Sequence, residues 1–354
     1  EADRTTPTPF EVQALLAEMR ANGLRDAVLE VSSHSLAQRR LGAARFAGAI
    51  FTNLTGDHLD YHHTMEEYFA AKQRLFTEAL EPGAPAVINV DDPWGATLAA
   101  GLAALPANAA PRVIPLSQGD AGRTGVRLCG LRTGAAGTEF TLDFAGGVLP
   151  GGAPRAVELR SPLAGVFNGY NLAGAAVLAL ALGLPETAIR EALAACPGAP
   201  GRLEPVHSPA GWTAFVDYAH SDDALDNVLR TLRDLRPRRL VVVFGCGGDR
   251  DRTKRPRMGA AAARHADLIF LTSDNPRTED PEAILREIQT GIPAGTPCRV
   301  LADRREAIRA AVAAAGPGDL LLLAGKGHEP YQERNGIKSH FNDREELAAA
   351  IAGR

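Results

Sequence analysis

The sequence predicts an α/β protein with two domains, each built on a mostly parallel sheet, and two observations support this prediction. First, three short apolar runs alternate with stretches of helical pattern: Leu240–Phe244, Leu268–Leu271 and Leu320–Leu323. Such runs are typical of buried parallel strands, because crossover helices cover both faces of the sheet. Second, a chain of 354 residues suits two domains of roughly 150 residues each.

The first 200 residues contain clear signals for helices and strands. Thr8, Pro9 and Glu11 combine an N-cap, a proline at the first helical position and a capping box, so a helix begins there. Thr64 and Glu67 predict a second helix that continues through Phe76. Strands are expected at Ala27–Val31, Ala47–Phe51 and Pro85–Val90. Glycine-rich β-like runs over residues 113–159 predict antiparallel strands at one side of the sheet, and an alanine-leucine helix is expected after Asn171.

A cluster of chain-breaking residues at Pro197–Gly201 predicts the domain boundary. We therefore expect domains at 1–200 and 201–354. In the second domain, Trp212–Asp217 predicts a strand and a helix follows Ser221. Another helix is signalled by Asp280 as the cap and Pro281 at the first position.

Composition narrows the class of protein. The formal charge of −4 gives no nucleic-acid or membrane footprint, and no apolar stretch reaches spanning length. The four cysteines have no metal or redox spacing, which favours a reducing cytoplasm; they are Cys129, Cys196, Cys246 and Cys298. The first methionine is Met19, inside a predicted helix, so we expect the sequence to be a fragment of a longer protein.

Polar residues follow each of the three apolar strands of the second domain. In open parallel sheets the ligand binds beyond the carboxyl ends of the strands. The sequence therefore predicts one cleft for a zwitterion that carries amine and carboxylate groups, lined by Arg250, Asp274, Asn275, Arg277, His328 and Glu329.

Three residues of the first domain suggest a metal site, although each has a simpler interpretation. Glu30 lies in an apolar segment, yet it could be a strand-end acid facing solvent, and His58 could be an incidental loop histidine. Lys72 shares a helical stripe with Tyr68, Leu75 and Phe76, which is also typical of a snorkelling lysine. Alternatively, a desolvated Lys72 amine can react with carbon dioxide, and the resulting carbamate would join Glu30 and His58 in binding Mg²⁺.

The ordered motifs of the chain closely resemble those of the Mur ligases, and the resemblance covers essentially the whole sequence. The segments that carry it are Thr5–Pro7, Glu30–His34, Gln38–Arg40, Asp57–His62, Ala70–Lys72, Phe167–Asn171, Gly201–Glu204, Val216–His220, Gly245–Asp251, Asp274–Arg277 and Gly325–Glu329.

The resemblance implies a fold and an activity. The expected fold is a central, mononucleotide-binding-type domain, incomplete at its N-terminus, followed by a Rossmann-like C-terminal domain that binds the incoming amino acid. The expected activity is ATP-dependent addition of meso-diaminopimelate to the D-glutamate of UDP-N-acetylmuramoyl-L-alanyl-D-glutamate, through an acyl phosphate, in peptidoglycan precursor synthesis. Small-molecule substrates, a monomer and a bacterial cytoplasmic location are implied, with no nucleic acid or membrane partner.

The resemblance also assigns roles to residues. Lys72, as a carbamate, with Glu30 and His58 would bind Mg²⁺, and Arg202 and His328 would complete the catalytic set. Four positions match those around ATP: Asn171, Arg202, Asp217 and His220. Five match the site for the muramoyl-dipeptide: Thr5, Thr6, Ser32, Gln38 and Arg40. Six match the diaminopimelate pocket: Arg250, Asp274, Asn275, Arg277, Gly325 and Glu329. Among these, Arg277 suits the distal carboxylate of diaminopimelate.

The chain departs from the family pattern in three places. It has no phosphate-binding loop of the G-x-x-x-x-G-K-[ST] kind, since Gly325-Lys326 is its only Gly-Lys pair and lacks the preceding glycine. In the family this loop and a UDP-binding domain precede the segment that matches Thr5–Pro7, so we expect the 354-residue chain alone to be inactive. Thr55-Gly56 and Ser221-Asp222 replace the usual Ser-Arg and Thr-Pro.

Three alternatives remain open from the sequence. One is a lysine-adding or folylpolyglutamate-type ligase, which Asp274–Arg277 argues against. The second is a dinucleotide oxidoreductase, suggested by Leu240–Phe244 running into Gly245–Gly248, but charged residues follow where the pyrophosphate helix should start. The third is a remnant that binds ligand without catalysis.

Overall fold

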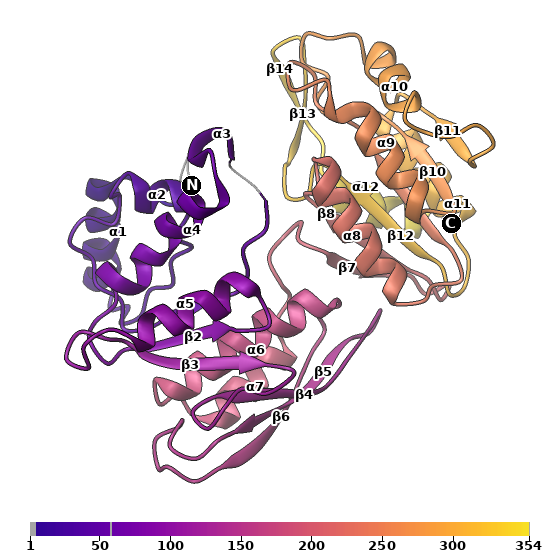
Figure 1. Cartoon of the computed structure of the whole chain (residues 1–354). Helices are drawn as coiled ribbons and strands as arrows, with labels where there is room; N and C mark the ends of the chain where they lie inside the picture. Colours follow the sequence, from indigo (N-terminus) through magenta and orange to yellow (C-terminus); the bar gives the residue numbers. More distant parts are fainter. Residues whose placement is uncertain (1–4, 57–58, 354) are drawn as a thin grey trace. The chain divides into compact units, whose positions relative to one another are not determined.

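The computed structural model describes residues 5–56 and 59–353, and its internal contacts divide the chain into two compact units (Figure 1). The N-terminal unit comprises Glu1–Leu131, Glu139–Arg160 and Gly169–Ala194. The C-terminal unit comprises Arg132–Thr138, Ser161–Asn168 and Ala195–Arg354. The predicted domain boundary after residue 200 stays a prediction, because each compact unit is assembled from three separate stretches of the sequence.

The N-terminal unit is built on a sheet of order β1-β2-β3-β4-β5-β6. Its strands are β1 (Ala49–Phe51), β2 (Pro85–Asn89), β3 (Arg112–Ser117), β4 (Val126–Gly134), β5 (Gly137–Phe144) and β6 (Arg155–Ser161). Neighbouring strands from β1 to β4 are parallel. Only two residues join β4 to β5, a connection that suits antiparallel strands. The residues 113–159 thus supply the strands at one side of the sheet, as predicted, although β3 and β4 are parallel.

The N-terminal unit also contains helices, several of which pack against this sheet. The helices are α1 (Pro9–Ala21), α2 (Ser33–Ala37), α3 (Leu59–His62), α4 (Met65–Arg74), the π-helical turn η1 (Leu75–Ala79), α5 (Pro93–Ala103), α6 (Val166–Ala181) and α7 (Glu186–Ala194). The predicted caps are confirmed: Glu11 accepts from Thr8 N (2.7 Å), and Thr64 accepts from Glu67 N (3.1 Å). Phe51 and Ile88 of the sheet pack with Leu98 of α5 in one core.

Two predictions for the N-terminal unit are wrong. Ala27–Val31 is not a strand: it has no ladder partner among the described residues, and Val28 is fully exposed at 103%. An apolar segment becomes a strand only when a neighbour accepts its backbone hydrogen bonds. In consequence Glu30 is exposed rather than enclosed by apolar residues. The alanine-leucine helix also begins earlier than predicted, at Val166, so Asn171 lies within α6.

The C-terminal unit contains a second sheet, of order β11-β10-β9-β12-β8-β7. Its strands are β7 (Glu204–His207), β8 (Thr213–Asp217), β9 (Leu240–Phe244), β10 (Leu268–Leu271), β11 (Cys298–Val300) and β12 (Leu320–Ala324). All neighbours are parallel except β7 and β8. A separate antiparallel pair consists of β13 (Tyr331–Arg334) and β14 (Ile337–His340). The three predicted apolar strands are therefore confirmed as adjacent, parallel and buried.

Helices cover both faces of this second sheet (Figure 1). They are α8 (Asp222–Asp234), α9 (Lys254–His265), α10 (Pro281–Gln289), α11 (Arg304–Ala314) and α12 (Asp343–Ala352). Along β9, Val242 packs in a core with α8, α9 and α10, whereas Val243 packs in a core with α11 and α12. Alternate side chains of each strand thus face opposite helical layers, which explains why these strands are apolar throughout.

The predicted helix starts in this unit are also confirmed. Ser221 caps α8 and accepts from Ala224 N (3.3 Å), while Asp280 caps α10 and accepts from Glu282 N (3.1 Å).

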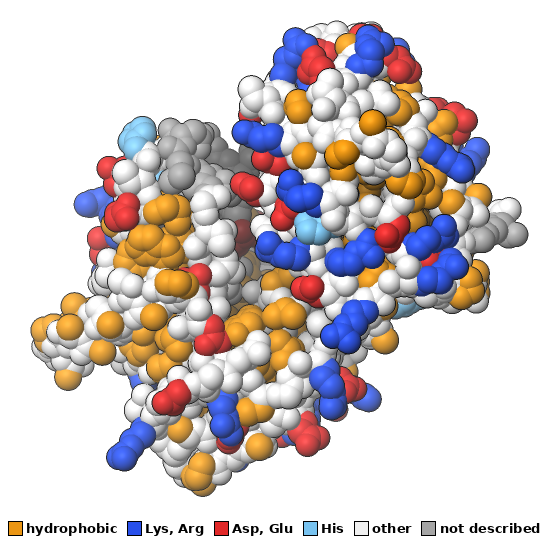
Figure 2. All heavy atoms as spheres, turned by 45° about the vertical axis from the view of Figure 1, so that its right-hand side comes forward, with side chains coloured by type: hydrophobic (Ala, Val, Ile, Leu, Met, Phe, Trp, Pro, Cys, Tyr) orange, Lys and Arg blue, Asp and Glu red, His pale blue; other side chains and the backbone are white. Residues whose placement is uncertain are grey.

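On the face shown in Figure 2, Lys and Arg side chains are interspersed with Asp and Glu, in keeping with the small net charge of −4. Within residues 5–56 and 59–353, none of the helices combines the length and the apolar character needed to cross a bilayer.

Candidate active site

Several predicted pocket residues meet at the carboxyl ends of β10 and β12. Asp274 and Asn275 follow β10 and are only 7% and 2% exposed. Asn275 Nδ2 donates to Glu329 Oε2 at 2.8 Å, which joins the two loops. Gly325 lies against Asp274, because a Cβ atom there would be 2.5 Å from Asp274 Oδ2. The structure therefore brings together four of the predicted residues: Asp274, Asn275, Gly325 and Glu329.

Lys326 belongs to this group and was missed by sequence reasoning. Its side chain is fully buried, and its Nζ is 3.2 Å from both Asn275 Oδ1 and Glu329 Oε2. The ammonium also lies 5.6 Å from the ring centroid of Tyr331. A lysine between two glycines, directly after an apolar strand, is the signal that could have found it. This cluster thus contains a buried cation beside Asp274 and Glu329.

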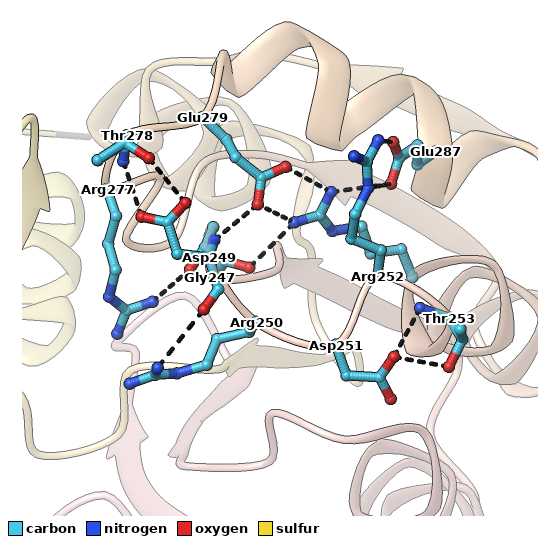
Figure 3. Close-up of polar contacts among 12 residues, drawn as sticks. Gly247, Asp249, Arg250, Asp251, Arg252, Thr253, Arg277, Thr278, Glu279 and Glu287 are labelled. Atoms are coloured by element: carbon cyan, nitrogen blue, oxygen red, sulfur yellow. Dashed lines mark hydrogen bonds and ion pairs between the residues drawn. The ribbon is translucent and has the colours of Figure 1, made fainter.

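Arg277 is held by the loop that follows β9 (Figure 3). Its Nη1 donates to Gly248 O at 2.8 Å, and its Nε is 3.6 Å from Glu333 Oε2. The backbone of Arg277 has φ +50°, and its N–H donates to Glu333 O at 3.1 Å. These contacts fix the side chain of Arg277, which is only one-fifth exposed. Arg250, from the same loop as Gly248, is exposed.

A buried arginine, Arg255, is linked through Glu279 to the loop that follows β9. Arg255 of α9 is fully buried and donates to Glu279 at 2.7 and 2.9 Å and to Glu287 at 2.8 Å. Glu279 Oε1 in turn accepts from Asp249 N at 2.6 Å. The hydrogen bonds from Arg255 lower the pKa of Glu279 to about 2. The loop that carries Arg250 is therefore tied to the helix behind it.

The residues predicted to surround ATP in this unit gather at the end of β8. Asp217 is 6% exposed and accepts from Leu203 N (2.7 Å) and Ala219 N (2.8 Å). Burial raises the pKa of Asp217, although these bonds and the charge of Arg202 act the other way. Arg202 is exposed, with its guanidinium carbon 5.5 Å from the Tyr218 ring centroid. An exposed cation beside a buried carboxylate suits recognition of a phosphate and of hydroxyl groups.

Tyr218 connects this group with the pocket at β10 and β12. Its ring lies 4.7 Å from the ring of His220 and 5.3 Å from that of His328, centroid to centroid. Burial raises the pKa of Tyr218, and the charges of Glu329 and Asp274 raise it further. His220 and His328 are both exposed. The C-terminal unit thus places all ten of its predicted site residues at the carboxyl edge of one sheet.

Predicted dipeptide-binding residues of the N-terminal unit form a hydrogen-bonded group around Thr6. Thr6 is fully buried, and its Oγ1 donates to Glu30 O (2.8 Å) and accepts from Ser32 N (3.0 Å). Arg40 Nη1 donates to Thr6 O (3.4 Å), and its Nη2 donates to Gln38 Oε1. Ser32 also caps α2. Thr5 and Gln38 are exposed, so within this group they present polar atoms to solvent.

Two of the three residues of the predicted metal site, Glu30 and Lys72, lie within the described part of the chain. His58 lies outside the described residues, and Glu30 is exposed. Lys72 is half-buried on α4, with Nζ 5.2 Å from the ring centroid of Tyr68. Residues 5–56 and 59–353 contain no group of three His, Cys, Asp or Glu side chains placed to hold a metal ion. An ammonium cannot bind Mg²⁺, so the donors fit this ion only if Lys72 carries a carbamate.

A second group near Lys72 was missed by sequence reasoning. His62 is 5% exposed, and its Nε2 lies 2.9 Å from Ser33 Oγ. Its ring stacks on Tyr68 at 5.2 Å and is 5.5 Å from the ring of His34, centroid to centroid. The stacking fixes the Tyr68 ring, over which the Lys72 amine lies.

Asn171, predicted near ATP, is exposed on α6 and has no recorded side-chain hydrogen bond in the described part of the chain.

Family models match both parts of the chain. Residues 1–179 match the Mur ligase middle domain, and residues 201–327 match the glutamate ligase domain of Mur ligases. Mur ligases as a family use ATP and Mg²⁺.

Individual relatives are similar over the whole sequence. The UDP-N-acetylmuramoyl-L-alanyl-D-glutamate--2,6-diaminopimelate ligase of Synechococcus elongatus is 47% identical, with 100% of this chain and 68% of the relative covered. The enzyme of the same name from Geobacter metallireducens is 46% identical, with 99% and 69% covered. This chain therefore spans about two thirds of the length of these relatives.

Solved structures of Mur ligases are also similar to this chain. A structure of a UDP-N-acetylmuramoyl-L-alanyl-D-glutamate--2,6-diaminopimelate ligase has a TM-score of 0.70 and 39% identity, with 97% of this chain and 68% of that chain covered. The MurF ligase from Thermotoga maritima in complex with ADP has a TM-score of 0.58, with 91% and 65% covered, and at 14% identity it supports the fold alone.

Proposed function

Because this chain belongs to the Mur ligase family, we propose that it joins meso-diaminopimelate to the D-glutamate of UDP-N-acetylmuramoyl-L-alanyl-D-glutamate at the expense of ATP. The observation that carries the proposal is 46–47% identity, across the whole chain, to relatives named for this reaction. The arrangement of Asp274, Arg277 and Glu329 supports it, because these side chains suit a ligand that has both an amine and a carboxylate.

The reaction proceeds in two steps. The D-glutamate carboxylate attacks the γ-phosphorus of ATP, ADP leaves, and an acyl phosphate forms. An amine of diaminopimelate then attacks the acyl carbon, phosphate leaves, the amine loses a proton and an amide bond results. Activation is needed because a free carboxylate is a poor electrophile, and an enzyme that holds both reactants in the right orientation supplies proximity. Mg²⁺ supplies charge neutralisation at the phosphates when bound.

The pocket at β10 and β12 recognises the diamino acid. Asp274 and Glu329 accept hydrogen bonds from its ammonium, and Arg277 makes a two-pronged contact with its distal carboxylate. Asn275 and the backbone at Gly325 complete the pocket, and Arg250 adds positive charge at its exposed side. His328 is the candidate proton acceptor, since it is exposed and adjacent to Tyr218. This arrangement favours diaminopimelate over lysine, which lacks the second carboxylate.

Residues for nucleotide and dipeptide recognition are assigned on each unit separately. On the C-terminal unit, Arg202 contacts phosphate oxygens, and Asp217 and His220 contact the remainder of the nucleotide. Asn171 is the candidate nucleotide-binding residue of the N-terminal unit. On the N-terminal unit, Thr5, Gln38 and Arg40 contact the dipeptide directly. Thr6 and Ser32 hold the loop in shape through the hydrogen bonds that their side chains already make.

We propose that Lys72 is carbamylated and that its carbamate binds Mg²⁺ with Glu30 and His58. The half-buried position of the amine over Tyr68 supports this role. Equilibration of the protein with ¹³C-bicarbonate should give a carbamate carbon signal in the NMR spectrum that is absent from Lys72→Met. An identical spectrum for the two proteins would rule out the modification.

The substrate is tested by calorimetry on the 354-residue chain, with and without ADP and Mg²⁺. We expect meso-diaminopimelate to bind and L-lysine to bind on the order of 10³-fold more weakly. Equal affinities would instead favour a lysine-adding ligase. A ligation assay by mass spectrometry then compares this chain with a version extended by the preceding segment of the Synechococcus elongatus relative. Absence of the tripeptide product from both would overturn the proposed reaction.

The proposal also includes the cellular location and the oligomeric state of the protein. The described cysteines are all free thiols, which suits a reducing bacterial cytoplasm. We also propose a monomer, and light scattering at the concentrations of the ligation assay tests this.

A further inference from the structure

The buried amine of Lys326 is surrounded by residues of the amino-acid pocket. Its Nζ is 3.2 Å from Asn275 Oδ1 and 3.2 Å from Glu329 Oε2, and the side chain has no exposed surface. Asn275 Nδ2 closes the triangle by donating to Glu329 Oε2 at 2.8 Å. A fully buried lysine is rare in proteins unless it is paired, and here both partners are residues that we assign to substrate binding.

The triangle determines how Asn275 is oriented. Its Oδ1 accepts from Lys326 Nζ and from Glu333 N, the latter at 2.9 Å. Because both neighbours of Oδ1 are donors with no accepting capacity, the amide can only place its oxygen there and its NH₂ group towards Glu329. Without the lysine, the backbone N–H of Glu333 alone would hold the amide oxygen.

The triangle also determines which oxygen of Glu329 is left for a ligand. Oε2 receives hydrogen bonds from Lys326 and Asn275, whereas no hydrogen bond to Oε1 is recorded within residues 5–56 and 59–353. A carboxylate with one oxygen held by two donors has a fixed orientation. Its second oxygen then remains available to accept from a substrate ammonium.

From this geometry we propose that Lys326 is a positioning residue for the amino-acid substrate, which deepens the proposed function and rests on it. Lys326 does not contact the substrate. Its ammonium holds Asn275 and Glu329 in the orientation that binds the diamino acid, and it balances the negative charge of Glu329 while the pocket is empty. Loss of the ammonium should therefore weaken binding of the amino acid and leave nucleotide binding unchanged.

The test compares three variants of the full 354-residue chain by calorimetry with meso-diaminopimelate and, separately, with ADP and Mg²⁺. Lys326→Met keeps an unbranched side chain that is one atom shorter, and it removes the charge. We expect it to weaken diaminopimelate binding by about 30-fold or more, with ADP affinity within about twofold of the unsubstituted chain. Lys326→Arg, which keeps a cationic donor, should recover most of the lost affinity.

A matched control is Lys338→Met. Lys338 is exposed, and its Nζ lies 4.2 Å from the ring centroid of the same Tyr331 that Lys326 approaches. It has no recorded contact with Asn275 or Glu329. This substitution should leave both affinities unchanged, so that a loss confined to Lys326 reports on the triangle rather than on the aromatic contact.

The outcomes are distinguishable. If the unsubstituted chain binds no diaminopimelate, the proposed function fails. If it binds and Lys326→Met binds equally well, the role of Lys326 is wrong, and parallel losses for diaminopimelate and ADP would show a purely structural role instead. Should Lys326→Met not fold, as judged by circular dichroism, Lys326→Gln replaces it. Gln retains one donor group without charge, and an unchanged diaminopimelate affinity for that variant would equally overturn the inference.

Discussion

Arg304 and Asp343 form a two-pronged ion pair in which neither side chain is exposed. Arg304 Nε is 2.7 Å from Asp343 Oδ1, and Nη2 is 2.6 Å from Oδ2. The same guanidinium donates to Ala324 O (3.0 Å) and to Ser273 O (3.4 Å). These carbonyls stand at the ends of β12 and β10, next to Gly325 and Asp274. The pair therefore anchors the two loops that follow β10 and β12, which carry Asp274 and Gly325.

Removal of one partner of this pair should be strongly destabilising. Asp343→Ala leaves a buried guanidinium uncompensated, and we expect a loss of about 3–5 kcal/mol in the free energy of unfolding. The measurement is urea denaturation followed by circular dichroism. A matched control on the same two helices is Glu346→Ala, which breaks the exposed pair with Arg305 (2.6 Å) and should cost no more than about 1 kcal/mol. Similar losses for the two variants would contradict the supporting role of Arg304.

Much of the C-terminal unit could be predicted from the sequence because its signals are local. An all-apolar run identifies a doubly covered strand, and polar residues directly after it must lie at the carboxyl edge of the sheet. Asp274, Asn275 and Glu329 were found in this way. Helix starts at Thr8, Ser221 and Asp280 were equally local, since each cap acts within three residues of itself.

The features that were missed depend on residues far apart in the sequence. Arg304 and Asp343 are 39 positions apart, and the burial of Lys326 depends on Asn275, 51 positions away. The glycines on either side of Lys326 mark it as a candidate, but the partners that its buried amine requires lie elsewhere in the sequence. The incorrect strand at Ala27–Val31 has the same cause, because pairing depends on a neighbouring strand and not on the apolar character of the segment itself.

Glu279 should make the stability of the protein depend on pH in the acidic range. Its pKa is lowered from 4.5 to about 2 by Arg255, so the ionised form is the one that stabilises the folded state. The contribution is fully present above pH 4.5 and is lost as the pH falls towards 2. Glu279→Gln should lower the free energy of unfolding at pH 7 by about 1–2 kcal/mol, allowing for partial exposure of the carboxylate.

The measurement for Glu279 is urea denaturation of the variant and of the unsubstituted chain at several pH values. The difference between them should shrink below pH 4.5. Glu282→Gln is the control, since Glu282 is exposed in the first turn of α10, three residues beyond Glu279, and should show no such trend. A difference for Glu279→Gln that stays constant down to pH 3 would show that its ion pair with Arg255 does not govern the effect.

Arg277 should determine the choice between diaminopimelate and lysine. Arg277→Ala removes the partner of the distal carboxylate, and we expect meso-diaminopimelate to bind on the order of 10³-fold more weakly while ADP binding is retained. Both affinities are measured by calorimetry. Arg286→Ala is the control, because Arg286 is exposed on α10, where it pairs with Asp280 at 3.5 Å. Equal losses for diaminopimelate and ADP would exclude a specific role in amino-acid recognition.

Gly325 should tolerate no side chain, for two separable reasons. Its φ of +112° is strained for any other residue, and a Cβ atom would lie 2.5 Å from Asp274 Oδ2. Gly336 separates these effects, because it has φ +75° but no atom within 4 Å of its would-be Cβ. Gly336→Ala should therefore cost about 1–2 kcal/mol of stability through backbone strain alone and leave ligand affinities intact.

Gly325→Ala should in addition displace the Asp274 carboxylate, so its affinity for meso-diaminopimelate should fall by about tenfold or more. Calorimetry and urea denaturation on both variants give the two quantities independently. If Gly325→Ala lost only as much stability as Gly336→Ala and kept its affinity, Asp274 would not be a ligand for the ammonium. A loss of affinity beyond the loss of stability would instead show that residue 325 must be glycine so that the Asp274 carboxylate can bind the substrate amine.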